Sequence, residues 1–216
     1  YVISSPFNSR KSLVLFMTKI PHILLAAGTS KRMGQPKQLL KWADKLLIQH
    51  QVETILSTTD KLYVVLGAYA ERIAPQLEQY DIELFRFDGW DKGMGNSLAF
   101  AVQQLLKVHS SLEGVLISLI DQPLVKGTHF QKMRAVFESG KKQIIASESD
   151  SAWVGVPVLY DAYYLDQIQS LNGEEGAKVI LKKHRKYVHT IPAGKTLVDM
   201  DTPEAYQKLY KAFSPQ

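Results

Sequence analysis

The sequence predicts an α/β protein, built as a three-layer α/β/α sandwich around a doubly wound, mainly parallel sheet in a single domain. Two observations carry this prediction. Apolar runs of strand length alternate with amphipathic stretches of helix length between residues 23 and 146, which is the pattern of repeated βαβ units. Loops that contain glycine or aspartate follow several of these strands, where open sheets of this kind bind ligands. The 216 residues suffice for one domain with a substantial core.

In the first half of the chain, strands and helices are expected to alternate. Ile23 to Ala26 is a short apolar run typical of a buried strand. Ile48, Val52 and Ile55 recur at helical spacing, so residues 45–57 are expected to form an amphipathic helix. The next expected elements are a strand at 61–66 closed by Gly67, a helix at 69–79 despite Pro75, a strand at 82–87, and a helix whose apolar face runs from Leu98 to Leu106.

In the second half, the run from Gly114 to Ile120 is the most apolar strand and leads into Asp121. No internal repeat or obvious linker interrupts the chain, so we expect one domain. The remaining expected elements are a helix at 128–139, a strand at 143–146, a strand at 153–160 with a rigid interruption, helices at 161–170 and 176–184, a strand at 187–191 and a helix at 203–212.

Residues 1–16 are expected to be a leader outside the domain, which would then cover residues 17–216. The leader has no periodic pattern, and the first strand starts shortly after Met17. Its apolar part, residues 13–16, is too short for the core of a signal peptide. We therefore leave it out of the fold prediction.

The composition excludes several classes of function. No apolar run approaches the ~20 residues that span a membrane. The absence of cysteine excludes disulfides and thiolate chemistry, and is compatible with the cytoplasmic location that we expect. The formal charge of +5 falls to +3 without residues 1–16, and the cations are scattered among acids. We therefore expect a small anionic substrate rather than a nucleic acid or a membrane.

The loop after the first strand is a candidate phosphate cradle. Gly28 and Gly34 allow the backbone to approach a ligand and to turn its N–H groups toward an anion. Hydroxyl groups at Thr29 and Ser30 add donors, and Lys31, Arg32 and Lys37 add positive charge. The loop matches neither the Walker P-loop nor GxGxxG. From the residues alone, a strand-to-helix turn with surface cations is an equally good interpretation.

Carboxylates supply candidate metal ligands. Asp121 follows the apolar strand on the expected ligand side of the sheet, where magnesium is often held by one or two carboxylates and substrate phosphates. A helix cap or a turn residue before Pro123 is the alternative. In extended chain, Asp199 and Asp201 project to the same side, with Met200 opposite. For Asp201 the alternative is a helix cap, because Thr202-Pro203 follows.

The opening stretch resembles the signature LAAGxSxRMGxxKxLL of the MobA-like nucleotidyltransferases and, within them, of the molybdenum cofactor cytidylyltransferases. Other segments are similar to further motifs of this family: 121–123 to DxP, 93–98 to GMGxSL and 199–205 to D[IV]DTPED. The resemblance covers about residues 18–212. The chain departs from the family at Met200, at Ala205 and in the motif GDxGAR, where Glu174 and Lys178 stand for the aspartate and the arginine.

The resemblance implies a role for each matching residue. Lys37 would stabilise the transferring α-phosphate, Arg32 would hold the departing pyrophosphate, and Mg²⁺ would be held by Asp121 together with Asp201. The nucleotide-binding residues would be Leu25, Ala26, Ala27, Gly28, Ser30, Gly34, Gly67, Gly95, Asn96 and Ser97. The acceptor-binding residues would be Gly155, Pro157, Gly176 and Lys178.

The resemblance also implies the reaction, which is transfer of CMP from CTP to molybdopterin-bound molybdenum cofactor with release of pyrophosphate. A molybdoenzyme would receive the product. The choice of CTP rests on Ala27, where relatives that use GTP more often have a second glycine. A GTP-dependent guanylyltransferase, a nucleotidyltransferase acting on a sugar phosphate or another small phosphorylated acceptor, and a non-catalytic nucleotide-binding chaperone of the cofactor remain alternatives.

Overall fold

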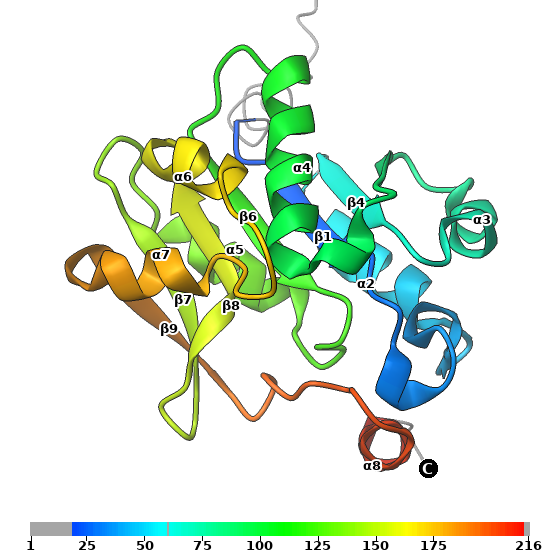
Figure 1. The fold of residues 1–216 in the computed structure, drawn as a ribbon. Coiled ribbons are helices and arrows are strands. Elements are labelled where there is room, and N and C mark those ends of the chain that lie inside the picture. Colours follow the sequence, from blue (N-terminus) through cyan, green and yellow to red (C-terminus); the bar gives the residue numbers. More distant parts are fainter. Residues whose placement is uncertain (1–18, 60, 214–216) are drawn as a thin grey trace, which may run out of the picture.

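A seven-stranded sheet forms the centre of the molecule, with strand order β5-β4-β1-β6-β8-β7-β9 (Figure 1). The computed structural model describes residues 19–59 and 61–213. The expected leader at residues 1–16 and its boundary at Met17 lie outside these residues. The strands are β1 (His22–Ala26), β4 (Leu62–Leu66), β5 (Glu83–Arg86), β6 (Gly114–Leu119), β7 (Ile144–Ser149), β8 (Val154–Asp161) and β9 (Val188–Gly194).

The sheet is mainly parallel, as the sequence predicts. β1 pairs in parallel with β4 and β6, β4 with β5, and β7 with β9, whereas β8 runs antiparallel to both of its neighbours. In the register of β1, Ala26 lies opposite Leu66, and Leu25 lies opposite both Val65 and Leu119. The carboxyl ends of three adjacent strands therefore lie at one edge, and the loops that follow them emerge side by side.

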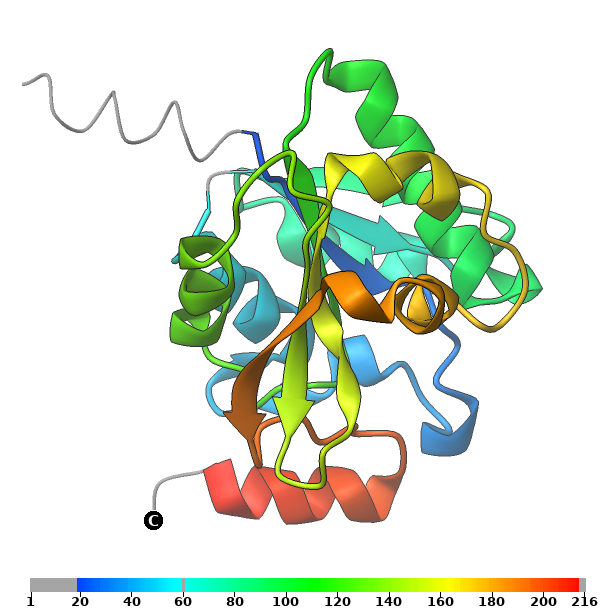
Figure 2. The ribbon, with the colours of Figure 1, turned by 90° about the vertical axis from the view of Figure 1, so that its left-hand side faces the viewer.

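Helices cover both faces of the sheet and give the predicted three layers (Figures 1 and 2). Alternate side chains of β1 enter separate cores, since Leu24 packs in one cluster and Ile23 in the other. α2 (Leu47–Leu56), α5 (Gly127–Ala135) and α8 (Pro203–Phe213) contribute to the core that contains Leu24. α4 (Met94–Val108), α6 (Leu165–Gln169) and α7 (Lys178–Lys183) contribute to the core that contains Ile23.

Several element boundaries differ from the sequence prediction for local reasons. The helix expected at 69–79 is divided into α3 (Ala70–Ile73) and a 3-10 turn at Ala74–Leu77, because Pro75 has no backbone N–H to continue the α-helical hydrogen bonds. A small hairpin of β2 (Lys41–Trp42) and β3 (Lys45–Leu46), which the sequence did not predict, precedes α2. α4 begins at Met94, so part of the expected glycine loop is its first turn.

The interruption expected in the strand at 153–160 is present as a break in register: Val158 of β8 pairs with Ala146, but Gly155 pairs with the next residue, Ser147, so Val156 and Pro157 are left out of the ladder with β7. Within residues 19–59 and 61–213, no helix has both the length and the apolar character that crossing a membrane requires.

Candidate functional site

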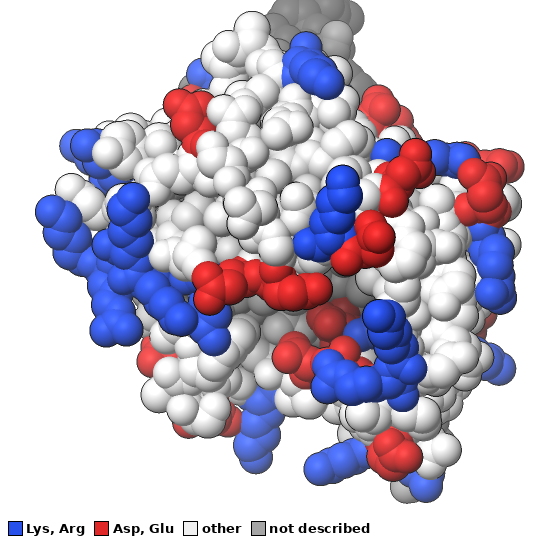
Figure 3. Space-filling view, viewed as in Figure 1, with Lys and Arg blue, Asp and Glu red and all other residues white. Residues whose placement is uncertain are grey.

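A cavity of about 380 Å³ opens at the edge of the sheet where β1, β4 and β6 end. The loop after β1, the start of α4, the end of β6 and the segment before α8 all contribute to its lining. Figure 3 shows a hollow on this face with acidic and basic side chains around it. The lining residues that carry charge are Lys31, Arg32, Lys37, Asp91, Asp121, Glu174 and Asp201.

The loop after β1 is folded tightly around a short 3-10 turn at Lys31–Met33. Ser30 and Gly34, which flank this turn, both have positive φ angles of 56° and 70°. Met33 is 4% exposed and anchors the turn in the core. The backbone N–H of Lys37 donates to Ser30 Oγ at 3.2 Å, which closes the loop on itself. The hydrogen bond from Lys37 helps to offset the strain of the left-handed backbone at Ser30, and it fixes the loop.

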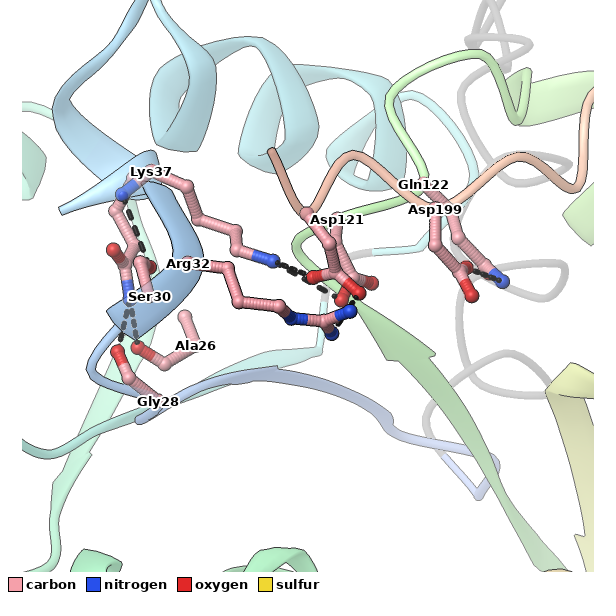
Figure 4. Close-up of polar contacts among 10 residues, drawn as sticks. Ala26, Gly28, Ser30, Arg32, Lys37, Asp121, Gln122 and Asp199 are labelled. Carbon is pink, nitrogen blue, oxygen red and sulfur yellow. Dashed lines mark hydrogen bonds and ion pairs between the residues drawn. The ribbon is translucent and has the colours of Figure 1, made fainter. Parts of the chain in front are cut away.

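Lys37 lies between two carboxylates from distant parts of the chain. Its Nζ is 2.6 Å from Asp201 Oδ1 and 3.3 Å from Asp121 Oδ2. The Arg32 guanidinium approaches the other oxygen of Asp201 at 2.6 Å. Figure 4 shows the Lys37 and Arg32 side chains extending from the loop toward Asp121. Lys37 is only 7% exposed, so these carboxylates compensate a buried cation.

The two carboxylates differ in their electrostatic environment. Burial raises the pKa of Asp121, and the charge of Lys37 only partly opposes this effect, while Asp199 and Asp201 add to it. Burial also acts to raise the pKa of Asp201, but its hydrogen bond with Lys37 and the charges of Lys37 and Arg32 outweigh it, so that pKa is lowered. The contrast reflects the deeper burial of Asp121, and the shorter Lys37 distance and the Arg32 contact of Asp201.

The residues present fit a divalent cation shared with a ligand. Asp121 Oδ1 is buried and has no hydrogen-bond partner among the described residues, so it retains an oxygen that a cation would satisfy. The described part of the chain contains no group of three or more histidine or carboxylate side chains arranged to hold a metal ion alone. Oxygen ligands from substrate phosphates would therefore complete the coordination, which is common for magnesium.

The structure shows what each of the three aspartate side chains contacts. Asp121 directs its side chain to Lys37 and is not merely a turn residue. Asp201 does not cap α8, because Thr202 Oγ1 accepts the hydrogen bond from the Ala205 N–H. Asp199 binds Gln122 Nε2 at 3.0 Å instead of joining the contacts of Asp201 (Figure 4).

The backbone fixes the segment that carries Asp201. The N–H of Met200 donates to the carbonyl of Asp121 at 2.8 Å, and Met200 is fully buried. The chain between β9 and α8 is therefore bound directly to the end of β6, which brings Asp201 to Asp121.

The nucleotide-binding residues expected from the sequence fall into two groups. The first group lines the cavity: Leu25, Ala27, Gly28, Ser30 and Ser97. The second group is adjacent but not in its lining: Ala26, Gly34, Gly67, Gly95 and Asn96. The second group supports neighbouring segments. A Cβ at Gly67 would lie 2.5 Å from the Ala27 oxygen, and the Gly95 N–H and Asn96 Oδ1 both bind the backbone of Gly173.

The expected acceptor residues lie around a second cavity of about 160 Å³. Gly155, Gly176 and Lys178 line it, and it shares Leu25, Met94 and Leu119 with the first cavity. Pro157 is not in this lining, and its carbonyl accepts a hydrogen bond from Ser147 Oγ at 2.7 Å. The two cavities are therefore adjacent.

Sequence reasoning missed several lining residues, of which Gln38 and Trp90 are the most informative. Gln38 is 1% exposed and contacts the loop after β1. Trp90 lies beside Gly67. A tryptophan next to a glycine-containing loop is a signal that could have drawn attention to Trp90. A glutamine in a polar, irregular stretch gives no such signal.

Comparison with known proteins places the chain in a family. Residues 22–188 match the family model of the MobA-like NTP transferase domain. The purine catabolism protein PucB of Bacillus subtilis (strain 168) is 26% identical over 209 residues, covering 89% of this chain and 96% of PucB. A protein of Nostoc sp. (strain PCC 7120) named "Probable molybdenum cofactor guanylyltransferase" is 28% identical over 196 residues, covering 87% and 89% of the two chains.

Among solved structures, the crystal structure of Rv0371c from Mycobacterium tuberculosis H37Rv is similar, with a TM-score of 0.77 and 25% identity, covering 90% of this chain and 99% of that one. A complex of Rv0371c with manganese matches with a TM-score of 0.74 and 23% identity, over 90% and 99% of the two chains. The fold, the site and the family match together show that this chain belongs to the MobA-like NTP transferase family and is a nucleotidyltransferase.

Proposed function

We propose that the protein transfers CMP from CTP to molybdopterin-bound molybdenum cofactor in a magnesium-dependent reaction that releases pyrophosphate. The observation that carries this proposal is the convergence of the glycine loop, Lys37, Asp121 and Asp201 on one cavity, beside a second cavity for an acceptor. The name of the Nostoc relative, which refers to the molybdenum cofactor, supports the choice of acceptor.

In this proposal the terminal phosphate of the acceptor attacks the α-phosphorus of CTP, and pyrophosphate leaves from the opposite side. Lys37 stabilises the negative charge that develops on the α-phosphate, while the loop and Arg32 hold the leaving group. A divalent ion between Asp121, Asp201 and the phosphates would supply further charge neutralisation. The solved manganese complex of Rv0371c supports a divalent ion of this kind. No general base is required, because a phosphate nucleophile is already ionised near neutral pH.

Nucleotide entry must rearrange the ion pairs. Lys37 and Arg32 both bind Asp201 in the structure described here. Phosphates compete with Asp201 for the Lys37 and Arg32 side chains. A divalent ion bound to Asp201 would compensate the negative charge of the carboxylate when these side chains leave it. Binding of nucleotide and of metal is therefore expected to be mutually reinforcing.

The preference for CTP rests on Ala27. Its side chain is 6% exposed at the cavity wall, next to Gly67 and Trp90, and leaves less room there than a glycine would. One methyl group contributes only about 1–3 kcal/mol to discrimination. GTP is the second candidate, and the name of the Nostoc guanylyltransferase favours it.

The test is an assay of pyrophosphate release with CTP and GTP, each with molybdopterin cofactor, with a sugar phosphate or with no acceptor, in Mg²⁺ and in Mn²⁺, together with a titration of nucleotide binding. We expect release with CTP that depends on both acceptor and metal. Faster release with GTP would assign a guanylyltransferase. Release only with a sugar phosphate would assign another acceptor, and binding without turnover would favour a chaperone. A molybdoenzyme that receives the product is the proposed protein partner.

A further inference from the structure

Gln38 ties the loop after β1 to the turn that carries Lys37. It is 1% exposed and follows Lys37 in the 3-10 turn Lys37–Leu39. Its Nε2 donates to the carbonyl oxygens of Ala26 at 2.7 Å and Gly28 at 3.2 Å. Figure 4 shows these two carbonyls directed at one amide nitrogen. A single side chain thus binds the backbone on both sides of Ala27.

These hydrogen bonds fix the direction of the backbone where the loop begins. The carbonyl of Ala27 is also held, since it accepts from the N–H of Ala68 at 3.2 Å. The C=O and N–H of a trans peptide point in opposite directions, so a fixed carbonyl of Gly28 also fixes the N–H of Thr29. Loop amides stabilise phosphate charge effectively when their direction is set before the ligand arrives.

The space beside Gly28 is open. A Cβ at Gly28 would meet no atom within 4 Å, and Gly28 lines the cavity. On the other side of the chain, the Gly28 carbonyl accepts the hydrogen bond from Gln38 Nε2. The loop is held from one side and open to a ligand on the other.

The amide at position 38 is unfavourable for the fold by itself. Gln38 Oε1 is buried and has no hydrogen-bond partner among the described residues. An acceptor buried in this way destabilises the folded state. An apolar side chain of equal length would fill the same space without that penalty, although it would lose the two donated bonds. The advantage of an amide at position 38 therefore lies in the hydrogen bonds that it donates to the Ala26 and Gly28 carbonyls.

We propose that Gln38 is a positioning residue for nucleotide binding. Its side-chain amide holds residues 26–28 in the conformation that receives the phosphates, and it keeps this backbone in register with Lys37. The inference rests on the proposed nucleotide binding. It adds Gln38, a residue to which the proposed function assigns no role.

The test compares Gln38→Met, which removes both donors at nearly constant size, with Gln38→Glu, which places an oxygen against the two carbonyls. Gln51→Met is the matched control, because Gln51 is 2% exposed on α2 and outside the lining of the cavity. Three quantities are measured: the Kd for CTP and for GTP with Mg²⁺, amide hydrogen exchange of residues 26–34 without ligand, and the thermal midpoint.

We expect Gln38→Met to accelerate exchange in residues 26–34 about fivefold or more, as loss of one net hydrogen bond implies, and to weaken nucleotide binding about tenfold. Its thermal midpoint should stay close to that of Gln51→Met, and Gln38→Glu should bind nucleotide more weakly still. Unchanged exchange and affinity in Gln38→Met would overturn the inference, as would an affinity loss matched by Gln51→Met. If the wild-type protein binds neither nucleotide, the proposed function fails. The exchange measurement needs no ligand, so unchanged exchange in Gln38→Met would separately overturn the positioning role of Gln38.

Discussion

Lys37 lies closer to Asp201 than to Asp121: its Nζ is 2.6 Å from Asp201 Oδ1, although the two residues are 164 positions apart in the sequence. The pair joins the turn Lys37–Leu39 to the segment before α8, and both residues line the cavity. Asp121 lies on the same ammonium group at 3.3 Å. The cation proposed for transition-state stabilisation is thus already held in place by the carboxylates proposed to bind the metal.

Replacing Lys37 by methionine tests whether this cation acts on the transition state. We expect kcat for pyrophosphate release to fall about 100-fold, which is typical for loss of one charge-stabilising donor. The Kd for CTP should change much less, because Arg32 and the loop still bind the other phosphates. Lys41→Met, at an exposed lysine of β2, is the control and should retain activity. Equal losses in rate and affinity would make Lys37 a binding residue only.

Asp121→Asn separates the proposed metal role of Asp121 from its role in the fold. Turnover should fall by at least about 100-fold at every Mg²⁺ or Mn²⁺ concentration, because an amide is a poor ligand for a hard cation. Thermal stability should be kept or increased, since burial raises the pKa of Asp121 and a neutral amide avoids the cost of burying a charge.

The control for Asp121→Asn is Asp199→Asn. Its Oδ1 can still accept the hydrogen bond from Gln122, so we expect a small effect on turnover. Activity of Asp121→Asn close to that of the wild type in Mg²⁺ would refute the metal assignment. A loss of similar size in both variants would indicate a general effect of negative charge at this edge.

The sequence predicted the parts of the site that depend on local pattern. β1 is buried throughout and is apolar after His22, and Asp121 follows β6 after one residue. The placement of both at one sheet edge therefore follows from parallel strand topology. The short hairpin β2–β3 escaped prediction because strands of two residues have no measurable periodicity.

Other features of the site depend on tertiary structure that a linear pattern does not encode. Asp201 is a capping candidate in the sequence, yet Thr202 makes the capping bond and leaves Asp201 to Lys37. That choice follows from the path of residues 197–202 past the end of β6, where Met200 is fixed to the Asp121 carbonyl. Gln38 was missed for a similar reason, since only the folded chain brings the Ala26 and Gly28 carbonyls to its amide.

Gly28 and Gly67 are glycines for different reasons, and alanine substitution should separate them. A Cβ at Gly28 would extend into the open cavity, so Gly28→Ala should fold normally and weaken CTP binding. A Cβ at Gly67 would lie 2.5 Å from the Ala27 oxygen and 2.7 Å from Trp90 Cβ. Gly67→Ala should therefore lose about 1–3 kcal/mol of unfolding free energy through overpacking.

Denaturant unfolding and CTP titration of both alanine variants check this contrast. The expected pattern is a binding defect without a stability defect at position 28, and a stability defect at position 67. Normal CTP affinity in Gly28→Ala would show that phosphates do not approach the loop at Gly28. Wild-type stability in Gly67→Ala would show that the contacts of Gly67 relax without cost.

His22 at the start of β1 predicts how the fold responds to acid. It is fully buried, its Nε2 lies 2.8 Å from Ser118 Oγ, and burial, with a smaller contribution from the charge of Arg134, lowers its pKa well below 6.5. Below pH 6.5 the unfolded chain therefore binds a proton that the folded protein does not. The free energy of unfolding falls with decreasing pH by up to about 1.4 kcal/mol per pH unit from this one group, until the pH reaches the folded-state pKa.

Urea unfolding between pH 7 and pH 5 measures the slope. His22→Gln should show a shallower dependence than the wild type, whereas His189→Gln, at an exposed histidine of β9, should keep the wild-type slope. Equal slopes in the wild type and His22→Gln would contradict a neutral, buried His22, because the variant lacks the imidazole whose protonation in the unfolded chain produces the extra slope.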